Sequence, residues 1–198
     1  MDEYIRNKKG EGGFSLIELM ITIAIMSTIF YMVANTLYQK ESRENEIYNA
    51  ARDLGTYIQQ YRMKTINENQ CYLFSFSGSR AVPVTDSYSI YLNSACDGDV
   101  ATSTLVTTVN LSSYSFNVIF GSIGSSGNTN DGISNNSFYI KPRGFLNTGT
   151  AVAIYFTSMH DYTNRLTEYQ VRVRVDQLTG RVKLNKFRDE TWSHSSST

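Results

Sequence analysis

The chain contains few of the residues on which enzyme chemistry usually depends. Two cysteines and two histidines occur among its 198 residues, and its formal net charge is zero. Zero net charge excludes attraction of the whole chain to a polyanion or an anionic membrane surface. The sequence has no Cys-x-x-Cys, no zinc-type histidine spacing, no Gly-x-Ser-x-Gly elbow and no phosphate-binding glycine loop. We therefore expect a protein that is not an enzyme and uses no cofactor.

Metal ligands are also scarce. Asp97 and Asp99 flank a glycine and offer carboxylate oxygens in a turn. Calcium takes six to eight oxygen ligands, which two carboxylates cannot supply alone. The sequence therefore predicts no metal site.

Charge is nearly missing from one long segment. Glu18 is the only formally charged residue between residues 14 and 39, and neither proline nor glycine occurs from residue 14 to 54. A helix needs roughly 20 mainly apolar residues to cross the ~30 Å hydrocarbon core of a membrane. We therefore predict a transmembrane helix over residues 14–36.

Glu18 requires a partner of opposite charge. A carboxylate at the middle of a bilayer costs about 2.5–3.5 kcal/mol on insertion scales. Cleavage after Gly13 would give Phe14 a free ammonium about one helical turn from Glu18. The two charges would then attract each other in a low-dielectric region, within one chain or between stacked neighbours.

The sequence Gly-Phe-Ser-Leu-Ile-Glu-Leu over residues 13–19 resembles the class III leader and cleavage site of type IV prepilins and of type II secretion pseudopilins. The resemblance implies that a prepilin peptidase cuts after Gly13 and that the new terminal Phe14 is N-methylated. It also implies that Glu18 aligns each subunit in a growing filament. The partners implied are other pilin or pseudopilin subunits and the prepilin peptidase.

Two ordinary targeting signals are alternatives. A secretory signal has a shorter apolar region with its cleavage site after that region, and a generic signal anchor explains neither the Gly-Phe junction nor Glu18. Arg6, Lys8 and Lys9 favour a cytoplasmic N-terminus, although Lys40 and Arg43 lie on the other side of the apolar run. We expect a single-pass protein of the inner membrane whose C-terminal domain lies in the periplasm.

Cys71 and Cys96 lie in the part of the chain expected to leave the cytoplasm. In an oxidising compartment, an isolated cysteine pair is most simply a disulfide. A metal pair and a reactive thiol are alternatives that no other residues support. We predict a Cys71–Cys96 disulfide.

The helical pattern continues beyond the membrane segment. Apolar residues recur at steps of four and three, which is typical of a helix with one buried face. We expect one continuous helix to about residue 67, whose second half packs against the domain. The residues with this spacing are Ile47, Ala51, Leu54, Ile58, Tyr61 and Thr65.

From residue 71 onward, short segments rich in Tyr, Phe, Val, Ile and Thr predict an antiparallel sheet system. Residues 121–136 are rich in Gly, Ser and Asn and predict a mobile surface loop. The expected fold class is α+β, a long helix packed on an antiparallel β-sheet domain. We divide the chain into a leader (1–13), a transmembrane helix (14–36), its amphipathic continuation (37–68) and a β-rich domain (69–198). The expected strands are 72–77, 88–92, 104–111, 115–120, 138–141, 152–157, 168–175 and 181–187.

The C-terminal half carries a second resemblance. An aromatic strand ending in Pro142-Arg143-Gly144 and a final hairpin with Thr179-Gly180-Arg181 resemble minor pilins and H-type pseudopilins. Major pilins often carry a proline where this chain has Asn35. The resemblance implies the pilin fold and a minor pilin of a type IV pilus or its initiating tip complex. A minor pseudopilin of a type II secretion system is the alternative.

The final hairpin is strongly basic. Between residues 165 and 188, seven basic residues stand against two acidic ones, an excess of +5. Arg172, Arg174, Arg181 and Lys183 alternate with apolar residues, so one face should be basic and the other apolar. Some minor pilins contact DNA through a Gly-Arg-x-Arg turn, which Gly-Arg-Val-Lys here resembles. These four residues are candidate DNA contacts, and the alternative is an ordinary solvated strand face.

Overall fold

The computed structural model describes residues 15–79, 83–124, 129–130, 132–133, 136–167, 169–188 and 191–194. Gly13 and Phe14, the expected cleavage site, lie outside these residues. The chain divides into two compact units, with the boundary between Glu41 and Ser42. Each unit is described by itself.

Helix α1 (Leu16–Glu68) runs through 53 residues without a break. This confirms the prediction of one continuous helix, which follows from the absence of proline and the late position of the first glycine. Asn69 ends the helix with φ of 54°, a left-handed conformation that asparagine tolerates at helix C-termini. Gly55 lies within the helix at a place where it packs closely on β10, since an added Cβ would lie only 3.3 Å from Cγ1 of Val182.

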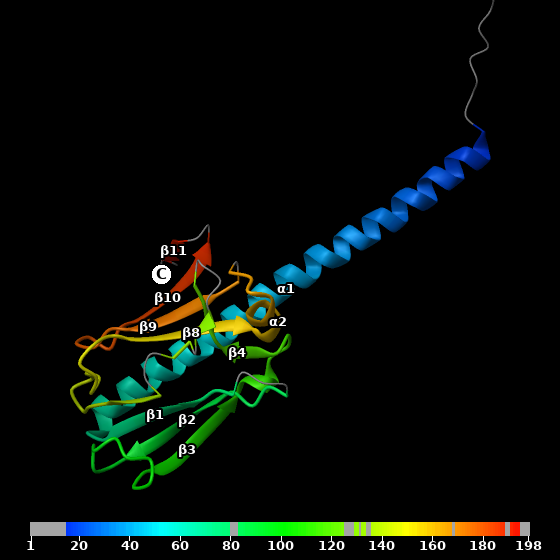
Figure 1. The fold of residues 1–198 in the computed structure, drawn as a ribbon. Coiled ribbons are helices and arrows are strands. Elements are labelled where there is room, and N and C mark those ends of the chain that lie inside the picture. Colours follow the sequence, from blue (N-terminus) through cyan, green and yellow to red (C-terminus); the bar gives the residue numbers. More distant parts are fainter. Residues whose placement is uncertain are drawn as a thin grey trace, which may run out of the picture. The chain divides into compact units, whose positions relative to one another are not determined.

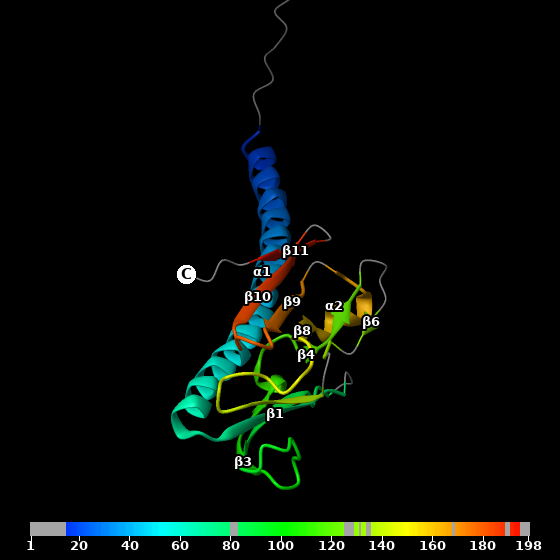
Figure 2. The ribbon, with the colours of Figure 1, turned by 90° about the vertical axis from the view of Figure 1, so that its left-hand side faces the viewer.

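The second half of α1 is a core element of the second unit. Ile47, Ala51, Leu54 and Ile58 are buried, at the spacing of four and three that the sequence pattern predicts. This stripe packs into a core shared with both main sheets. Figures 1 and 2 show these sheets beside this half of the helix.

The first sheet has four antiparallel strands in the order β3-β2-β1-β7. Central β1, paired with β2 on one side and β7 on the other, is buried on both faces along most of its length. The strands are β1 (Cys71–Ser77), β2 (Ser87–Asn93), β3 (Thr104–Asn110) and β7 (Ser137–Ile140).

The second sheet has five antiparallel strands in the order β11-β10-β9-β8-β4. A two-stranded sheet of β5 (Ser122–Ile123) and β6 (Thr129–Asn130), the 3-10 helix η1 (Leu111–Ser113) and helix α2 (Met159–Asn164) complete the unit. The five strands are β4 (Val118–Phe120), β8 (Val152–Ser158), β9 (Val171–Val175), β10 (Val182–Arg188) and β11 (Thr191–His194).

Aromatic side chains join the two main sheets. Phe74 stacks on Phe138 within the first sheet, with ring centroids 5.1 Å apart. Phe76 meets Phe120 of the second sheet at 5.7 Å, and Phe120 meets Phe156 at 5.2 Å. Such aromatic pairs add about 0.5–1.5 kcal/mol each beyond the burial of their area. The α+β class and the antiparallel pairing are therefore as predicted, with two main sheets around one core.

The prediction of a mobile surface loop over residues 121–136 is partly wrong. Ile123 is only 2% exposed. Its backbone N–H donates to Oε1 of Gln170 at 2.7 Å, and Nε2 of Gln170 donates to its carbonyl at 2.9 Å. The buried amide of Gln170 thus replaces a strand partner and holds this end of the segment. Residues 125–128, 131 and 134–135 lie outside the described residues.

Two strand boundaries also differ from the prediction. Strand β4 begins at Val118 instead of residue 115, because Phe116 and Asn117 have φ of 61° and 50° and form a turn. Strand β9 begins at Val171 instead of residue 168.

The predicted disulfide is confirmed. Cys71 is bonded to Cys96, and their Cα atoms are 5.4 Å apart. The bond joins the start of β1, just after the end of α1, to the loop that follows β2. A disulfide closing a loop of this length stabilises a fold by about 3 kcal/mol, mainly by constraining the unfolded chain.

Candidate assembly site and basic face

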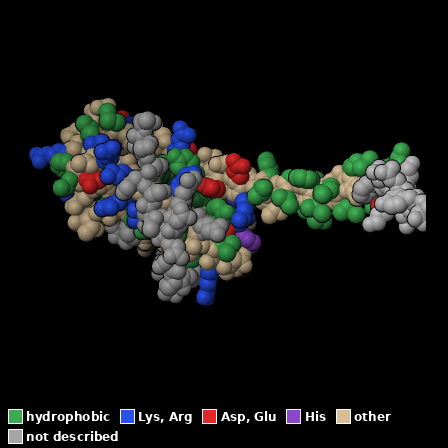
Figure 3. Space-filling model, turned by 90° about the horizontal axis from the view of Figure 1, so that it is seen from above, with side chains coloured by type: hydrophobic (Ala, Val, Ile, Leu, Met, Phe, Trp, Pro, Cys, Tyr) green, Lys and Arg blue, Asp and Glu red, His purple; other side chains and the backbone are tan. Residues whose placement is uncertain are grey.

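In its described residues, the first unit is an apolar helix whose large hydrophobic side chains are exposed. Large apolar side chains from Leu16 to Tyr38 are exposed, and Leu16 is 76% exposed. Figure 3 shows hydrophobic side chains covering this unit. By length and composition, α1 is able to cross a membrane, and none of its most apolar window is buried.

The serine and threonine hydroxyl groups between residues 16 and 38 are satisfied inside the helix. Each of these four donates to a backbone carbonyl three or four residues earlier, at 2.7–2.9 Å. Such bonds remove the cost of placing a hydroxyl in hydrocarbon or in a helix interface. The four donors are Thr22, Ser27, Thr28 and Thr36.

Glu18 lies in the first turn of α1. A carboxylate there interacts favourably with the positive end of the helix dipole. The only basic residue in the described part of this unit is Lys40, which lies 22 residues further along the helix. At 1.5 Å per residue this separation is about 33 Å, so Lys40 cannot pair with Glu18 in one helix.

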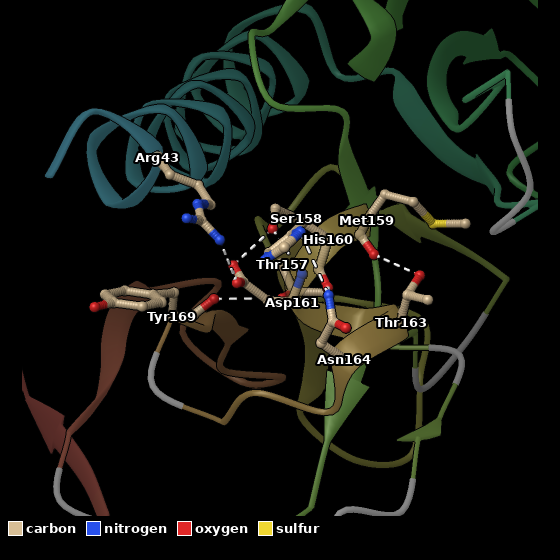
Figure 4. A network of polar contacts seen from close by, with 9 residues as sticks. All are labelled: Arg43, Thr157, Ser158, Met159, His160, Asp161, Thr163, Asn164 and Tyr169. Carbon is tan, nitrogen blue, oxygen red and sulfur yellow. Dashed lines mark hydrogen bonds and ion pairs between the residues drawn. The ribbon is translucent and has the colours of Figure 1, made fainter. Parts of the chain in front are cut away.

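Two ion pairs hold α1 at the start of the second unit. Nη1 of Arg43 donates to Oδ1 of the fully buried Asp161 at 2.7 Å. Figure 4 shows Arg43 of α1 pointing toward this carboxylate, and its guanidinium also lies 5.9 Å from the ring of Tyr169. Lys186 of β10 pairs with Glu44 at 2.9 Å. Neither pair follows from sequence spacing, because the partners lie far apart along the chain.

The network in Figure 4 includes a serine, a histidine and an aspartate, but their contacts are those of a capped helix. Oγ of Ser158 donates to Oδ2 of Asp161 and accepts from its backbone N–H, so Ser158 is the N-cap of α2. The Nδ1 atom of His160 instead meets the side-chain amide of Asn164. The arrangement fixes α2 and the Arg43 pair.

The β9–β10 hairpin has the alternation that the sequence predicts. Val171, Val173 and Val175 are buried. Arg174 and Lys183 lie directly opposite each other on neighbouring strands, and both are exposed. Arg172 is half-buried between Tyr155 of β8 and Asn185 of β10. Like charges placed directly opposite destabilise a sheet, so this pair favours an anion nearby.

The turn that joins β9 to β10 presents Arg181 to solvent. Oδ1 of Asp176 accepts from the backbone N–H groups of Leu178 and Thr179 and from the Thr179 hydroxyl. The hydrogen bond from the Thr179 backbone is the main reason why the pKa of Asp176 is lowered. Gly180 has φ of 61°, and a Cβ there would lie 2.6 Å from Nε of Arg62.

Fewer basic side chains lie on the exposed face of the hairpin than the seven basic residues between residues 165 and 188 would suggest. Lys186 is paired with Glu44 and lies over the ring of Tyr48. Arg165 caps the C-terminus of α2 instead of lying on the hairpin. The side chain of Arg188 lies outside the description. We therefore define the basic face as Arg172, Arg174, Arg181 and Lys183. Figure 3 shows several Lys and Arg side chains close together on the second unit.

Asp97 and Asp99, the weak calcium candidates, hold the loop after β2. Oδ1 of Asp97 accepts from the side chain of Asn93 at 2.8 Å and from the backbone of Asp99 at 3.0 Å. The latter bond is the main cause of the lowered pKa of Asp97. Within the described residues, no group of three His, Cys, Asp or Glu side chains is placed to hold a metal ion.

A protein-family model described as the prokaryotic N-terminal methylation motif matches residues 8–30. Neither a comparison with curated proteins nor one with solved structures finds a match. The matched segment includes the Gly13–Phe14 junction, Glu18 and much of the apolar half of α1. The chain thus carries an N-terminal methylation motif of the type IV prepilin kind. Together with the apolar helix, this N-terminus indicates a membrane-anchored protein.

The Arg43–Asp161 pair should dominate the electrostatic stability of the second unit. Arg43→Ala should lower the free energy of unfolding by about 3–5 kcal/mol, because it leaves a buried carboxylate unpaired. Denaturant unfolding of the full chain in detergent measures the effect. Lys64→Ala is the control, because its pair with Glu68 spans 3.9 Å between exposed side chains and should contribute at most about 1 kcal/mol.

The double variant Arg43→Ala with Asp161→Ala should be more stable than Arg43→Ala alone, since no buried carboxylate then remains without a cation. Equal effects of Arg43→Ala and Lys64→Ala would contradict the assignment.

Proposed function

We propose that the chain is a minor pilin-like structural subunit of a type IV pilus or of its initiating tip complex. A prepilin peptidase cuts between Gly13 and Phe14, and Phe14 is then N-methylated. The observation that carries the proposal is the match of the methylation motif to residues 8–30, directly joined to an exposed apolar helix with one carboxylate. The subunit acts as a building block and not as an enzyme.

Before assembly, the subunit is anchored in the inner membrane with its second unit in the periplasm. During assembly, the apolar side chains of residues 16–38 leave the lipid and pack against the same segment of neighbouring subunits. Small and hydroxyl-bearing residues such as Ala24, Ser27 and Thr28 allow close packing of helices in such an environment. Glu18 meets the methylated ammonium of Phe14 on a neighbour, and this pair sets the axial position of each subunit.

The same N-terminus serves pseudopilins of type II secretion systems, so a minor pseudopilin is the alternative assignment. The resemblance of the C-terminal half to H-type pseudopilins favours it, while the lack of a proline at Asn35 separates the chain only from major pilins. Identification of the genes adjacent to the one that encodes the chain distinguishes the two, because pilus and secretion operons differ in their outer-membrane and motor components.

Glu18→Ala should leave membrane insertion intact and lower incorporation into filaments at least tenfold, because the buried ammonium of a neighbour loses its counter-ion. A tenfold loss corresponds to about 1.4 kcal/mol per contact. Immunoblots of sheared filaments and of membranes measure both quantities. Glu41→Ala is the matched control, since Glu41 is an exposed carboxylate of the same helix beyond the apolar segment. Normal assembly of Glu18→Ala would overturn the mechanism.

DNA binding for uptake is a second candidate function, and one geometric observation favours it. Arg174 and Lys183 lie opposite each other on exposed strands, and Arg181 lies in the adjoining turn. Three cations on one hairpin complement the negative charge of a phosphate backbone, and the release of counterions drives such contacts. Lys183 supplies a point charge instead of the planar fork of arginine.

Arg181→Ala combined with Lys183→Ala should weaken DNA binding by the full chain in detergent. The slope of log affinity against log salt should fall by about 2, since each lost phosphate contact removes about 0.9. Arg52→Ala combined with Lys64→Ala removes the same charge from exposed positions on α1 and should leave the slope unchanged. Equal binding by both double variants would remove this function.

A further inference from the structure

An open groove of about 510 Å³ lies at the end of the second unit where α1 finishes. Three segments form it: the end of α1, the disulfide-bonded loop after β2 and the turn after β7. Figures 1 and 2 both show the end of α1 beside the segment that follows β7. The residues that line the groove are Asn69, Cys96, Lys141, Pro142, Arg143 and Phe145. They include two cations and no carboxylate.

The turn after β7 presents Lys141 and Phe145 side by side. The backbone N–H of Lys141 donates to the carbonyl of Phe145 at 2.8 Å, and the N–H of Gly144 donates to the carbonyl of Lys141 at 2.7 Å. Gly144 has φ of 79°, as the last position of such a three-residue hairpin loop requires. The next pair along the hairpin, Ile140 and Leu146, is buried. Because successive pairs point to opposite faces, Lys141 and Phe145 project outward on the same side.

Contacts to neighbouring elements hold the groove in shape. Nε of Arg62 on α1 donates to the carbonyl of Gly144 at 3.3 Å. The N–H of Leu146 donates at 3.0 Å to the carbonyl of Gln177, which lies in the turn between β9 and β10. On the other wall, Cys96 is fixed by its disulfide to the start of β1. A site that is already ordered loses little conformational entropy when a partner binds.

The two cations of the groove have no partner of opposite charge among the described residues. Lys141 and Arg143 are exposed, and neither side chain forms an ion pair or a hydrogen bond there. The acidic residues next in sequence to the other walls are already engaged. Glu68 pairs with Lys64 at 3.9 Å, and the carboxylate of Asp97 accepts hydrogen bonds inside its own loop. The groove therefore carries two positive charges that are able to meet an anion.

Exposed apolar side chains accompany these cations. Phe145 lines the groove and is 42% exposed. Ile66 of α1 lies beside the turn, since its Cδ1 is 3.1 Å from the position that a Cβ on Gly144 would occupy. Met63 lies on the same side of α1, three residues earlier, and Leu178 lies in the adjoining turn between β9 and β10. These four apolar side chains are all exposed. Exposed apolar patches rimmed by polar groups mark sites of interaction.

We propose that the groove binds an extended acidic segment of a partner protein, in which an apolar side chain lies between two carboxylates. The carboxylates pair with Lys141 and Arg143, and the apolar side chain packs on Phe145 and Pro142. Charge complementarity selects the acidic residues, and arginine and aromatic residues are enriched at protein interfaces. A bare phosphate backbone would leave the apolar lining without a partner. The proposal goes beyond the filament function, because the contact does not involve residues 16–38.

Site-specific photocross-linking of the full chain in its native cells tests the proposal. Phe145 is replaced by the photoreactive residue p-benzoylphenylalanine, and mass spectrometry identifies the peptide that is joined to it after illumination. The expected product is a protein peptide with two or more Asp or Glu residues within about four positions of the attachment, as an extended segment places them. The matched control is the same replacement at Phe116, which is 38% exposed in the turn before β4. The control should give about tenfold less of that product.

Charge reversal makes the outcome decisive. Adding Lys141→Glu and Arg143→Glu to the probe at Phe145 should lower the yield of this product about tenfold, because like charges then face the acidic segment. Arg174→Glu with Lys183→Glu reverses two exposed cations of the basic face and should leave the yield unchanged. Lys141→Gln with Arg143→Gln replaces the first pair if reversal disturbs the turn. Equal loss from both pairs, a product with lipid or nucleic acid, a joined peptide without acidic residues, or no product would each overturn the proposal.

Discussion

The apolar side chains in the first half of α1 require an environment other than water. The role of the whole helix depends on this constraint. Burial of apolar surface is worth about 25 cal/mol per Å², and nearly every side chain from residue 16 to 38 is exposed within its own unit. The internal hydrogen bonds of Thr22, Ser27, Thr28 and Thr36 make the segment compatible with lipid and with a bundle of like helices. Glu18 is the one formally charged residue of this segment. In the proposed function, its need for a cation makes the membrane anchor an assembly element as well.

The same helix has a different role in the second unit. There, Ile47, Ala51, Leu54 and Ile58 form one side of a core whose other sides are two antiparallel sheets. The Arg43–Asp161 pair attaches the first turns of this half to helix α2, and the Glu44–Lys186 pair attaches them to β10 of the second sheet. A single uninterrupted helix therefore carries one segment that needs an external partner and one that is satisfied by its own domain. The basic face lies on this domain.

Sequence reasoning succeeds where periodicity or a specific motif carries the information. The long helix follows from steps of four and three and from the absence of proline, and the disulfide follows from an isolated cysteine pair in a segment expected to lie in an oxidising compartment. The division of the strands between two sheets could not be predicted, because it depends on pairing between distant segments. Helix α2 has a polar sequence without a clear amphipathic pattern of apolar residues. It forms because Ser158 caps it and Asp161 binds Arg43. Burial of Ile123 depends on the amide of Gln170, and the size of the basic face depends on Glu44. Both partners are distant in sequence, so no local pattern shows them.

The central claim is that the mature chain begins with a charged amine placed to pair with Glu18. Mass spectrometry of the N-terminal peptide from purified filaments or membranes tests it directly. The account predicts a mature polypeptide that starts at Phe14 and carries a methyl group on its terminal nitrogen. A mature chain that starts at Met1, or at any residue other than Phe14, would contradict it.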